Sequence, residues 1–290
     1  MRNSINFENL NILQRINYFK ENFSKTQLKI GDFILENFDK TVFYTSTELA
    51  YKCGVSESSV VRFANFIQYK GYSDMQNDLQ NFLREKITMT QRLHNLTEKK
   101  GNQTQILYDV LQKGKDDIQW LIDNINPNTF DEIVDIISTA KKVYLVGSRS
   151  SYSVTYFLGL SLKWIRNNVY IIDGINRDFD DISEITSKDV LISLSLPRYL
   201  KSTLNIHRYA YNRGVKTICI TDSITSPLVK YTTIPLLINN EILSFSDNLI
   251  PVITIVTALL NSIAAKEKKA EQKMAKKEAF WNDFELYQKF

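Results

Sequence analysis

One short segment carries four polar side chains whose types and spacing suit direct contact with DNA bases. Within residues 49–67, LAYKCGVSESSVVRFANFI, they are Ser58, Ser59, Arg62 and Asn65. On a helix these positions share one face, because residues three or four apart are neighbours. Arginine pairs bidentately with guanine, asparagine pairs with adenine, and serine hydrogen-bonds to bases or phosphates. The segment therefore predicts a helix face that reads double-stranded DNA.

The helix with this face must be held by another helix, and the surrounding residues predict both. Thr45 and Glu48 fit a capping box that starts a first helix, and Gly54 supplies the positive φ that ends it. Ser56 caps a second helix. Its apolar stripe falls at i, i+3, i+4 and i+7, namely Val60, Phe63, Ala64 and Ile67. Ala50 is small enough for the second helix to cross closely, which is helix-turn-helix spacing.

Any corner between two packed helices favours a small residue, a glycine and an apolar contact, so this spacing alone leaves a purely structural role open. The exposed polar face favours DNA binding, because major-groove readers place such residues near the start of their second helix. Lys52, Lys70 and the loop 69–73 are placed to contact phosphates on either side of that face, and Ser56 is expected to help position the helix. We predict that the DNA-binding residues are Ser56, Ser58, Ser59, Arg62, Asn65 and Lys70.

The N-terminal region resembles the corresponding domain of the RpiR (MurR/RpiR) family of bacterial transcription regulators. The resemblance rests on IGDFILEN, on ELAYKCGVSESSVVRF and on the following KGYSD, and it covers about residues 10–85. It implies a SIS (sugar isomerase) domain after a linker. We expect a homodimer or tetramer in which two N-terminal domains contact the half-sites of a pseudo-palindromic operator.

The pattern along the chain predicts two domains of different class. From Phe7 to about Leu83 the apolar residues recur at helical spacing, with a further capping box at Ser73, which predicts an all-helical domain over 1–85. Residues 86–105 turn polar and lose this period, which predicts a linker. Four short β-branched runs follow at residues 142–147, 168–173, 189–195 and 215–221. Strands alternating with helices predict a parallel sheet flanked by helices, so 106–265 is expected to be an α/β SIS domain before a helical tail at 266–290. The tail is expected to dock on its own protein through Phe280, Trp281 and Phe284, with contact of this basic helix to DNA or a membrane as the alternative.

Composition narrows the classes of function. The chain has 290 residues, 43% of them hydrophobic, and a formal net charge of +4, which permits a polyanionic partner without proving one. Cys53 and Cys219 fit neither a disulfide framework nor a zinc site, and nothing indicates a metal or another cofactor. The most apolar stretch starts at Leu249 and is interrupted by Pro251, which favours a buried helix over a membrane span. With no recognisable targeting segment, a cytoplasmic location and no membrane partner are expected.

A cluster of small polar residues follows the first predicted strand of the α/β region. Gly147 ends this strand, Arg149 follows in the turn, and three serines surround the start of the next helix: Ser148, Ser150 and Ser151. Hydroxyls and free backbone N–H groups at a helix start suit an anion, and ligands of open α/β sheets bind at this edge. Serines that merely cap the helix are an equal alternative from the residues alone. The SIS resemblance implies a sugar phosphate or a related anion here.

A second turn departs from the SIS pattern, which is normally Ser-x-Ser-Gly-x-Thr. This chain has Ser195-Leu-Pro-Arg-Tyr-Leu200, which puts a standard phosphosugar contact in doubt. Arg198 and Arg149 could bind a phosphate or carboxylate, or could be surface residues that pair with nearby carboxylates. Asp222, after the fourth predicted strand, could accept a ligand hydroxyl or cap its own loop. The predicted ligand-binding residues are Gly147, Ser148, Arg149, Ser150, Ser151, Ser195, Arg198 and Asp222.

Isomerase activity is the main alternative, since SIS domains occur in sugar-phosphate isomerases. Isomerisation needs a general base. Of the two histidines, His94 lies in the expected linker and His207 in a structural position, while Asp222, Glu241 and Asp247 remain candidate bases. A phosphosugar-binding adaptor for a protein partner is a third class, but it leaves the reading face without a role. We therefore expect a DNA-binding regulator of carbohydrate-metabolism genes, controlled by a sugar-phosphate-like effector, and no enzyme.

Overall fold

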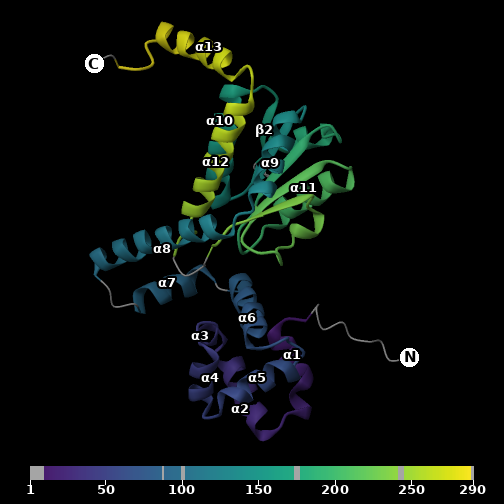
Figure 1. The fold of residues 1–290 in the computed structure, drawn as a ribbon, viewed down its shortest axis with the longest axis vertical. Helices are drawn as coiled ribbons and strands as arrows, with labels where there is room; N and C mark the ends of the chain where they lie inside the picture. Colours follow the sequence, from purple (N-terminus) through teal and green to yellow (C-terminus); the bar gives the residue numbers. More distant parts are fainter. Residues whose placement is uncertain (1–9, 87, 99–101, 173–176, 241–244, 289–290) are drawn as a thin grey trace. The chain divides into compact units, whose positions relative to one another are not determined.

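The computed structural model describes residues 10–86, 88–98, 102–172, 177–240 and 245–288. Two compact units divide the chain, the first ending at Thr88 and the second beginning at Met89, and each is described by itself (Figure 1). Among the described residues, no single helix is long and apolar enough to cross a membrane. The consecutive helices α12 (Ile250–Lys266) and α13 (Ala270–Asp283) reach that length and composition together, but as a pair bent by 104°.

The first unit is built of helices, as its sequence predicts. They are α1 (Ile12–Phe19), α2 (Lys25–Glu36), α3 (Phe38–Thr41), α4 (Ser46–Cys53), α5 (Glu57–Phe66) and α6 (Tyr72–Lys86). Local hydrogen bonds set several of the helix starts. The Thr45 hydroxyl accepts from the Glu48 N–H at 3.2 Å, and the Glu48 carboxylate accepts from the Thr45 N–H at 2.8 Å, which is the predicted capping box of α4. The capping box predicted at Ser73 is wrong, because α6 begins at Tyr72 and Ser73 lies inside the helix.

The second unit opens with three helices, the first of which is unexpected. They are α7 (Met89–Glu98), α8 (Gln103–Asn124) and α9 (Pro127–Thr139). α7 lies in the segment 86–105, where the sequence predicts a linker without helical period. Its Arg92 side chain is buried, with 2% exposed, and pairs with Asp247. Its three apolar residues, Met89, Leu93 and Leu96, do fall at helical spacing, but they are few and stand among polar residues, so the prediction of a linker without helical period is wrong for this segment.

A five-stranded parallel sheet forms the centre of the described part of the second unit. The strands are β1 (Val143–Gly147), β2 (Val169–Ile172), β3 (Val190–Leu194), β4 (Lys216–Thr221) and β5 (Ile234–Leu237), in the order β2-β1-β3-β4-β5. The first four coincide with the predicted runs. The sequence does not predict β5, which has four residues and contains Pro235; proline is tolerated because β5 is an edge strand.

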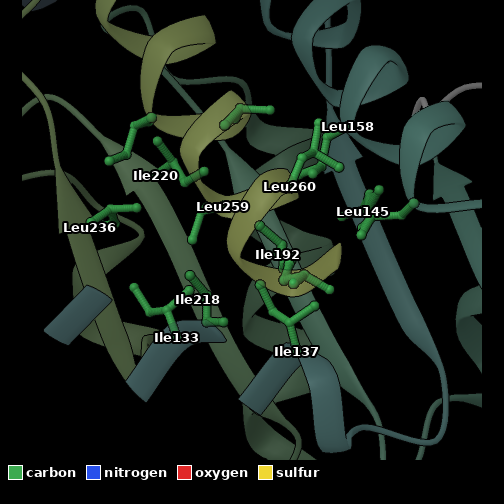
Figure 2. Close-up of a cluster of buried hydrophobic side chains, with 14 of the residues drawn as sticks. Ile133, Ile137, Leu145, Leu158, Ile192, Ile218, Ile220, Leu236, Leu259 and Leu260 are labelled. Atoms are coloured by element: carbon green, nitrogen blue, oxygen red, sulfur yellow. The ribbon is translucent and has the colours of Figure 1, made fainter. Parts of the chain in front are cut away.

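Helices cover both faces of this sheet, as expected for an α/β domain. The covering elements are α9, α10 (Ser150–Ile165), α11 (Lys201–Asn212), α12 and the 3-10 helix η3 (Arg177–Glu184). On one face, Figure 2 shows Ile137 of α9, Leu158 of α10 and Leu259 of α12 in one cluster with strand residues that include Ile192 and Ile218. A second cluster on the other face joins α11 and η3 to β1 and β3. The loops at the carboxyl ends of the strands are left to form a site.

The last two helices test the expectations for the C-terminal region. α12 packs in the core, as the apolar stretch from Leu249 predicts. On α13, the Trp281 ring packs edge-on against Trp164 of α10, with the ring centroids 6.0 Å apart. Phe280 and Phe284 are 56% and 71% exposed. The expected docking of three aromatic side chains therefore holds for Trp281 and is wrong for the other two.

Candidate functional site

The helix-turn-helix of the first unit has the geometry that its sequence predicts. α4 ends at Gly54, whose backbone is left-handed at φ 63° and ψ 43°, a conformation that glycine adopts without strain. The Val55 N–H then donates to the Ala50 carbonyl at 3.0 Å and closes the turn. Ser56 caps α5, since its hydroxyl accepts from the Ser59 N–H at 3.3 Å. The start of α5 is thereby set relative to α4.

One face of α5 is fully buried against the rest of the first unit. Val60, Phe63, Ala64 and Ile67 each have 0% of their surface exposed, and Ala50 of α4 has 4%. This packing fixes the rotation of α5 about its own axis, because turning the helix would expose the apolar stripe to water. The opposite, polar face must point away from the core.

The predicted DNA-contacting side chains lie on that outward face and just beyond it. Ser56, Ser58, Arg62, Asn65 and Lys70 are exposed, and Ser59 is half-buried. The serine hydroxyls are linked, with Ser56 Oγ 3.0 Å from Ser58 Oγ and 2.8 Å from Ser59 Oγ. Arg62 donates to the Ser59 hydroxyl at 3.4 Å, a long hydrogen bond that holds the guanidinium weakly. These groups can turn toward a ligand at small cost.

The second unit contains a cavity of about 310 Å³ at the carboxyl ends of its central strands. Its walls come from α7, from the β1–α10 turn, from the β3–α11 turn and from the segment before α12. The lining residues with hydrogen-bonding side chains are Arg92, Ser148, Arg149, Ser150, Ser151, Ser195, Arg198, Thr203, Ser246 and Asp247. The structure thus brings together six of the predicted ligand residues, from two turns that the sequence separates widely.

The remaining two predicted ligand residues, Gly147 and Asp222, lie outside the lining and shape it. A Cβ at Gly147 would lie 2.2 Å from Thr155 Oγ1, so a residue without a side chain lets α10 begin this close to β1. Asp222 accepts a hydrogen bond from the Tyr199 hydroxyl at 2.8 Å, which ties the β3–α11 turn to the end of β4. Both residues affect the cavity through the position of its walls.

Two arginines of the cavity have backbone conformations that are unusual for residues with a side chain. Arg149 has φ 56° and ψ −129°, and Arg198 has φ 66°. Glycine adopts positive φ readily, whereas other residues are strained there by about 1–3 kcal/mol. Arg198 stands where the SIS pattern has glycine, so the turn keeps a glycine-like backbone although the residue is different. Such strain persists where the surrounding structure holds it, and it concentrates at functional sites.

The cavity also contains an ion pair that the sequence does not signal. Arg92 Nη1 donates to Asp247 Oδ1 at 2.8 Å, and the other oxygen of Asp247 accepts from the Ser150 hydroxyl. Arg92 Nε is buried and has no hydrogen-bond partner among the described residues. Because Arg92 and Asp247 are 155 positions apart, no local motif contains both.

Two family models match the chain. The first is the helix-turn-helix domain of the rpiR family, over residues 10–86, and the second is the SIS domain, over residues 136–265. Together they match more than half of the chain. This chain belongs to the RpiR family of transcription regulators. The family and the fold class predicted from the sequence are confirmed.

Relatives of this RpiR-family chain include proteins named as HTH-type transcriptional regulators. One from Haemophilus influenzae is 23% identical over 239 residues, which cover 80% of this chain and 81% of its own length. HexR of Escherichia coli is 22% identical over 227 residues, covering 78% and 76%. Among solved structures, Vibrio vulnificus NanR complexed with ManNAc-6P has a TM-score of 0.59 and 22% identity, covering 94% of this chain and 99% of NanR. The sugar isomerase domain of an RpiR transcription factor from Sphaerobacter thermophilus has a TM-score of 0.56 and 24% identity, covering 60% and 97%.

The candidate bases for isomerisation have other roles in this RpiR-family structure or lie outside the described residues. His207 is 0% exposed, with Nδ1 2.7 Å from Ser193 Oγ and Nε2 2.8 Å from Thr232 Oγ1, and burial lowers its pKa to about 4. The two aspartates are held by the hydrogen bonds given above. Glu241 and the side chain of His94 lie outside the described residues. Within the described ranges, no group of three or more His, Cys, Asp or Glu side chains could hold a metal ion.

Proposed function

We propose that this chain is a cytoplasmic, homo-oligomeric regulator of carbohydrate-metabolism genes that binds operator DNA through α5 and a sugar phosphate or related anion in its SIS domain. The observation that carries the proposal is the combination of two surfaces in one RpiR-family chain. One is the outward Ser, Arg and Asn face of α5. The other is the serine- and arginine-lined cavity at the sheet edge. NanR, a structural relative, has been solved with a sugar phosphate, which supports this ligand class.

In the DNA-binding role, Arg62 and Asn65 contact base edges in the major groove. Phosphate contacts orient the helix without reading sequence, and they come from Ser56, Ser58, Ser59 and Lys70. The backbone N–H of Lys70 already donates to the Asp74 carboxylate at 3.0 Å. Lys70 therefore contacts phosphate through its exposed ammonium group.

In the ligand-binding role, serine hydroxyls and arginine guanidinium groups both bind the anion. The hydroxyl donors are Ser148, Ser150, Ser151 and Ser195, and the cations are Arg149 and Arg198. Arginine replaces hydroxyl contacts with a fixed charge, which suits a phosphate or a carboxylate. Gly147 and Asp222 hold the two turns that present these groups. The altered second turn thus remains part of an anion site.

Exposed apolar side chains support a homo-oligomer. On α8 they are Ile106, Leu107, Tyr108, Val110, Leu111, Ile118 and Ile122, and on α10 they are Tyr156, Phe157, Leu160 and Trp164. Apolar surface gathered along a helix in this way is typical of interaction sites rather than of solvated surface. A dimer formed through one of these helices would carry two reading helices, which is the number that a pseudo-palindromic operator requires.

Replacing Arg62 by alanine is expected to weaken binding to the cognate operator by about 1–3 kcal/mol, because a bidentate base contact is lost. Binding to a scrambled duplex should change little. The measurement is fluorescence anisotropy of the full chain on its own upstream intergenic DNA and on the scrambled duplex, at two salt concentrations. Arg208→Ala, which removes an exposed arginine of α11, is the matched control and should leave both affinities unchanged.

The Arg62 experiment also separates the classes of function. An unchanged preference for the operator in Arg62→Ala would show that α5 is wrongly assigned as the reading helix. If the wild-type chain binds no duplex at either salt concentration, the isomerase or the adaptor is favoured. Phosphate contacts strengthen all DNA binding at low salt, so a DNA-binding protein should bind at least under that condition.

Arg149→Gly is expected to stabilise the second unit by about 1 kcal/mol, because glycine relieves the strain at φ 56°. The same change should weaken the binding of sugar phosphates, since it removes a cation from the cavity. Urea unfolding and calorimetric titration with a panel of sugar phosphates measure the two effects. A variant that is less stable than the parent would show that side-chain contacts of Arg149 outweigh its backbone strain.

A further inference from the structure

We propose that Arg92 of α7 is an anion-binding residue of the SIS cavity, and that Asp247 neutralises it as an internal counter-anion until the anionic group of a ligand takes its place. This inference rests on the proposed function, because it assumes that the ligand carries a phosphate or a similar anion. It assigns a ligand contact to the helix that leads from the DNA-binding unit into the SIS domain. The exchange of one anion for the other is the regulatory event.

Burial shows that Arg92 needs an anion at all times. The Arg92 side chain is 2% exposed, and a buried guanidinium without a counter-charge is strongly destabilising. Asp247 supplies that charge through one hydrogen bond, from Nη1 at 2.8 Å. Arginine has five N–H donors, and Nε is buried without a partner among the described residues. The pairing with Asp247 therefore leaves at least one donor of this cavity-lining side chain unused.

The geometry of Asp247 explains why this capacity stays unused. Its second oxygen accepts from the Ser150 hydroxyl, so the carboxylate bridges Arg92 to the β1–α10 turn and does not pair bidentately with the guanidinium. A phosphate group has more acceptor oxygens than a carboxylate, and arginine binds it in a forked geometry. A phosphate in the cavity can therefore satisfy both Arg92 and Ser150.

Exposure indicates which of the two charged residues moves. The side chain of Asp247 is 26% exposed, compared with 2% for Arg92. The carboxylate can turn into water and regain hydration, whereas the guanidinium has no comparable route. Two anions in one cavity of about 310 Å³ also repel each other, which drives Asp247 outward when a ligand enters.

Replacing Asp247 by a ligand anion changes the contacts that hold α7 in the second unit. Without ligand, Arg92 ties α7 to the segment before α12 through Asp247. With an anion bound, Arg92 ties α7 to the ligand, and through it to the serine turn after β1. α6 ends at Lys86 and α7 begins at Met89, so this change of contact occurs next to the DNA-binding unit along the chain. A ligand that binds better after the exchange thereby favours one arrangement of α7.

Calorimetric titration of the full chain with inorganic phosphate tests the inference. Asp247→Asn removes the internal anion but retains a hydrogen-bonding side chain, and it should bind phosphate about tenfold more tightly. Arg92→Gln removes the buried cation and should bind about tenfold more weakly. Lys266→Gln is the control, because Lys266 forms an exposed ion pair with Asp135 and does not line the cavity. Its phosphate affinity should equal that of the wild type.

Hydrogen exchange at the amides of residues 89–98 adds a second readout. Phosphate should change the protection of α7 in the wild type, and this change should be absent in Arg92→Gln. Tighter binding by Asp247→Asn supports the inference even where Arg92→Gln is poorly folded, because a purely structural ion pair predicts no gain. Phosphate binding that is equal in the wild type and both variants overturns this inference and leaves the proposed function standing. Absence of phosphate binding by the wild type and by Asp247→Asn overturns both this inference and the proposed ligand class.

Discussion

Replacing Asp117 by alanine is expected to lower the free energy of unfolding of the second unit by about 3–5 kcal/mol, because two hydrogen bonds to its buried carboxylate, each worth about 1.5–3 kcal/mol, are lost. Asp117 lies on α8 and is 0% exposed, and its carboxylate contacts Lys113 at 2.8 Å. It also accepts from the side-chain amides of Asn239 at 2.8 Å and Asn248 at 2.6 Å. Alanine would remove the buried acceptor that these three partly buried donors share.

The same substitution should disturb the anion cavity, because Asn248 directly follows Asp247 in the chain. Urea unfolding followed by tryptophan fluorescence reports on the second unit, since all three tryptophans lie beyond residue 88. Asp116→Ala is the matched control: Asp116 is exposed and accepts from Gln112 at 2.7 Å, so its loss should change stability by about 0.5 kcal/mol or less. Equal losses in the two variants would contradict the role given to Asp117.

Lowering the pH from 6.5 to 4 is expected to destabilise the second unit by about 3 kcal/mol through His207. Burial lowers the pKa of His207 to about 4, whereas the ordinary value of a histidine is 6.5. Between these values the unfolded chain binds a proton at this residue and the folded protein does not. Proton uptake therefore favours unfolding. The contribution of His207 to stability is fully present above pH 6.5 and declines as the pH falls toward 4.

The contribution of His207 is measured as a difference, because carboxylates also titrate in acid. Urea unfolding of the wild type and of His207→Gln is compared at several pH values between 4 and 7. The variant should lose less stability across this range, since glutamine keeps hydrogen-bonding groups near Ser193 and Thr232 but takes up no proton. His94→Gln, which removes the other histidine, should lose as much stability between pH 7 and 4 as the wild type does. Parallel curves for the wild type and His207→Gln would show that His207 is not the source of the acid sensitivity.

The sequence by itself determined the helix-turn-helix, because the interactions that form it lie within a few positions of one another. The Thr45 capping box, the left-handed Gly54 and the Ser56 cap are local, and the structure confirms each of them. The burial of Val60 and Phe63 follows from the helical period. The same locality made four strands predictable from β-branched runs. The two serine turns could be singled out as well, because each follows a strand directly, and their role in binding stays a proposal.

The tertiary structure decided how these turns form one cavity and which further residues line it. Arg92 and Asp247 pair across 155 positions, and the helix with Arg92 has only three apolar residues among polar ones. The strand β5 depends on an edge position that tolerates Pro235, and the strained backbones of Arg149 and Arg198 depend on how their turns close. A pattern of residue types records local preference and hydrophobic period. It does not record which buried charges meet or which backbone the packing imposes, because those depend on contacts between distant segments.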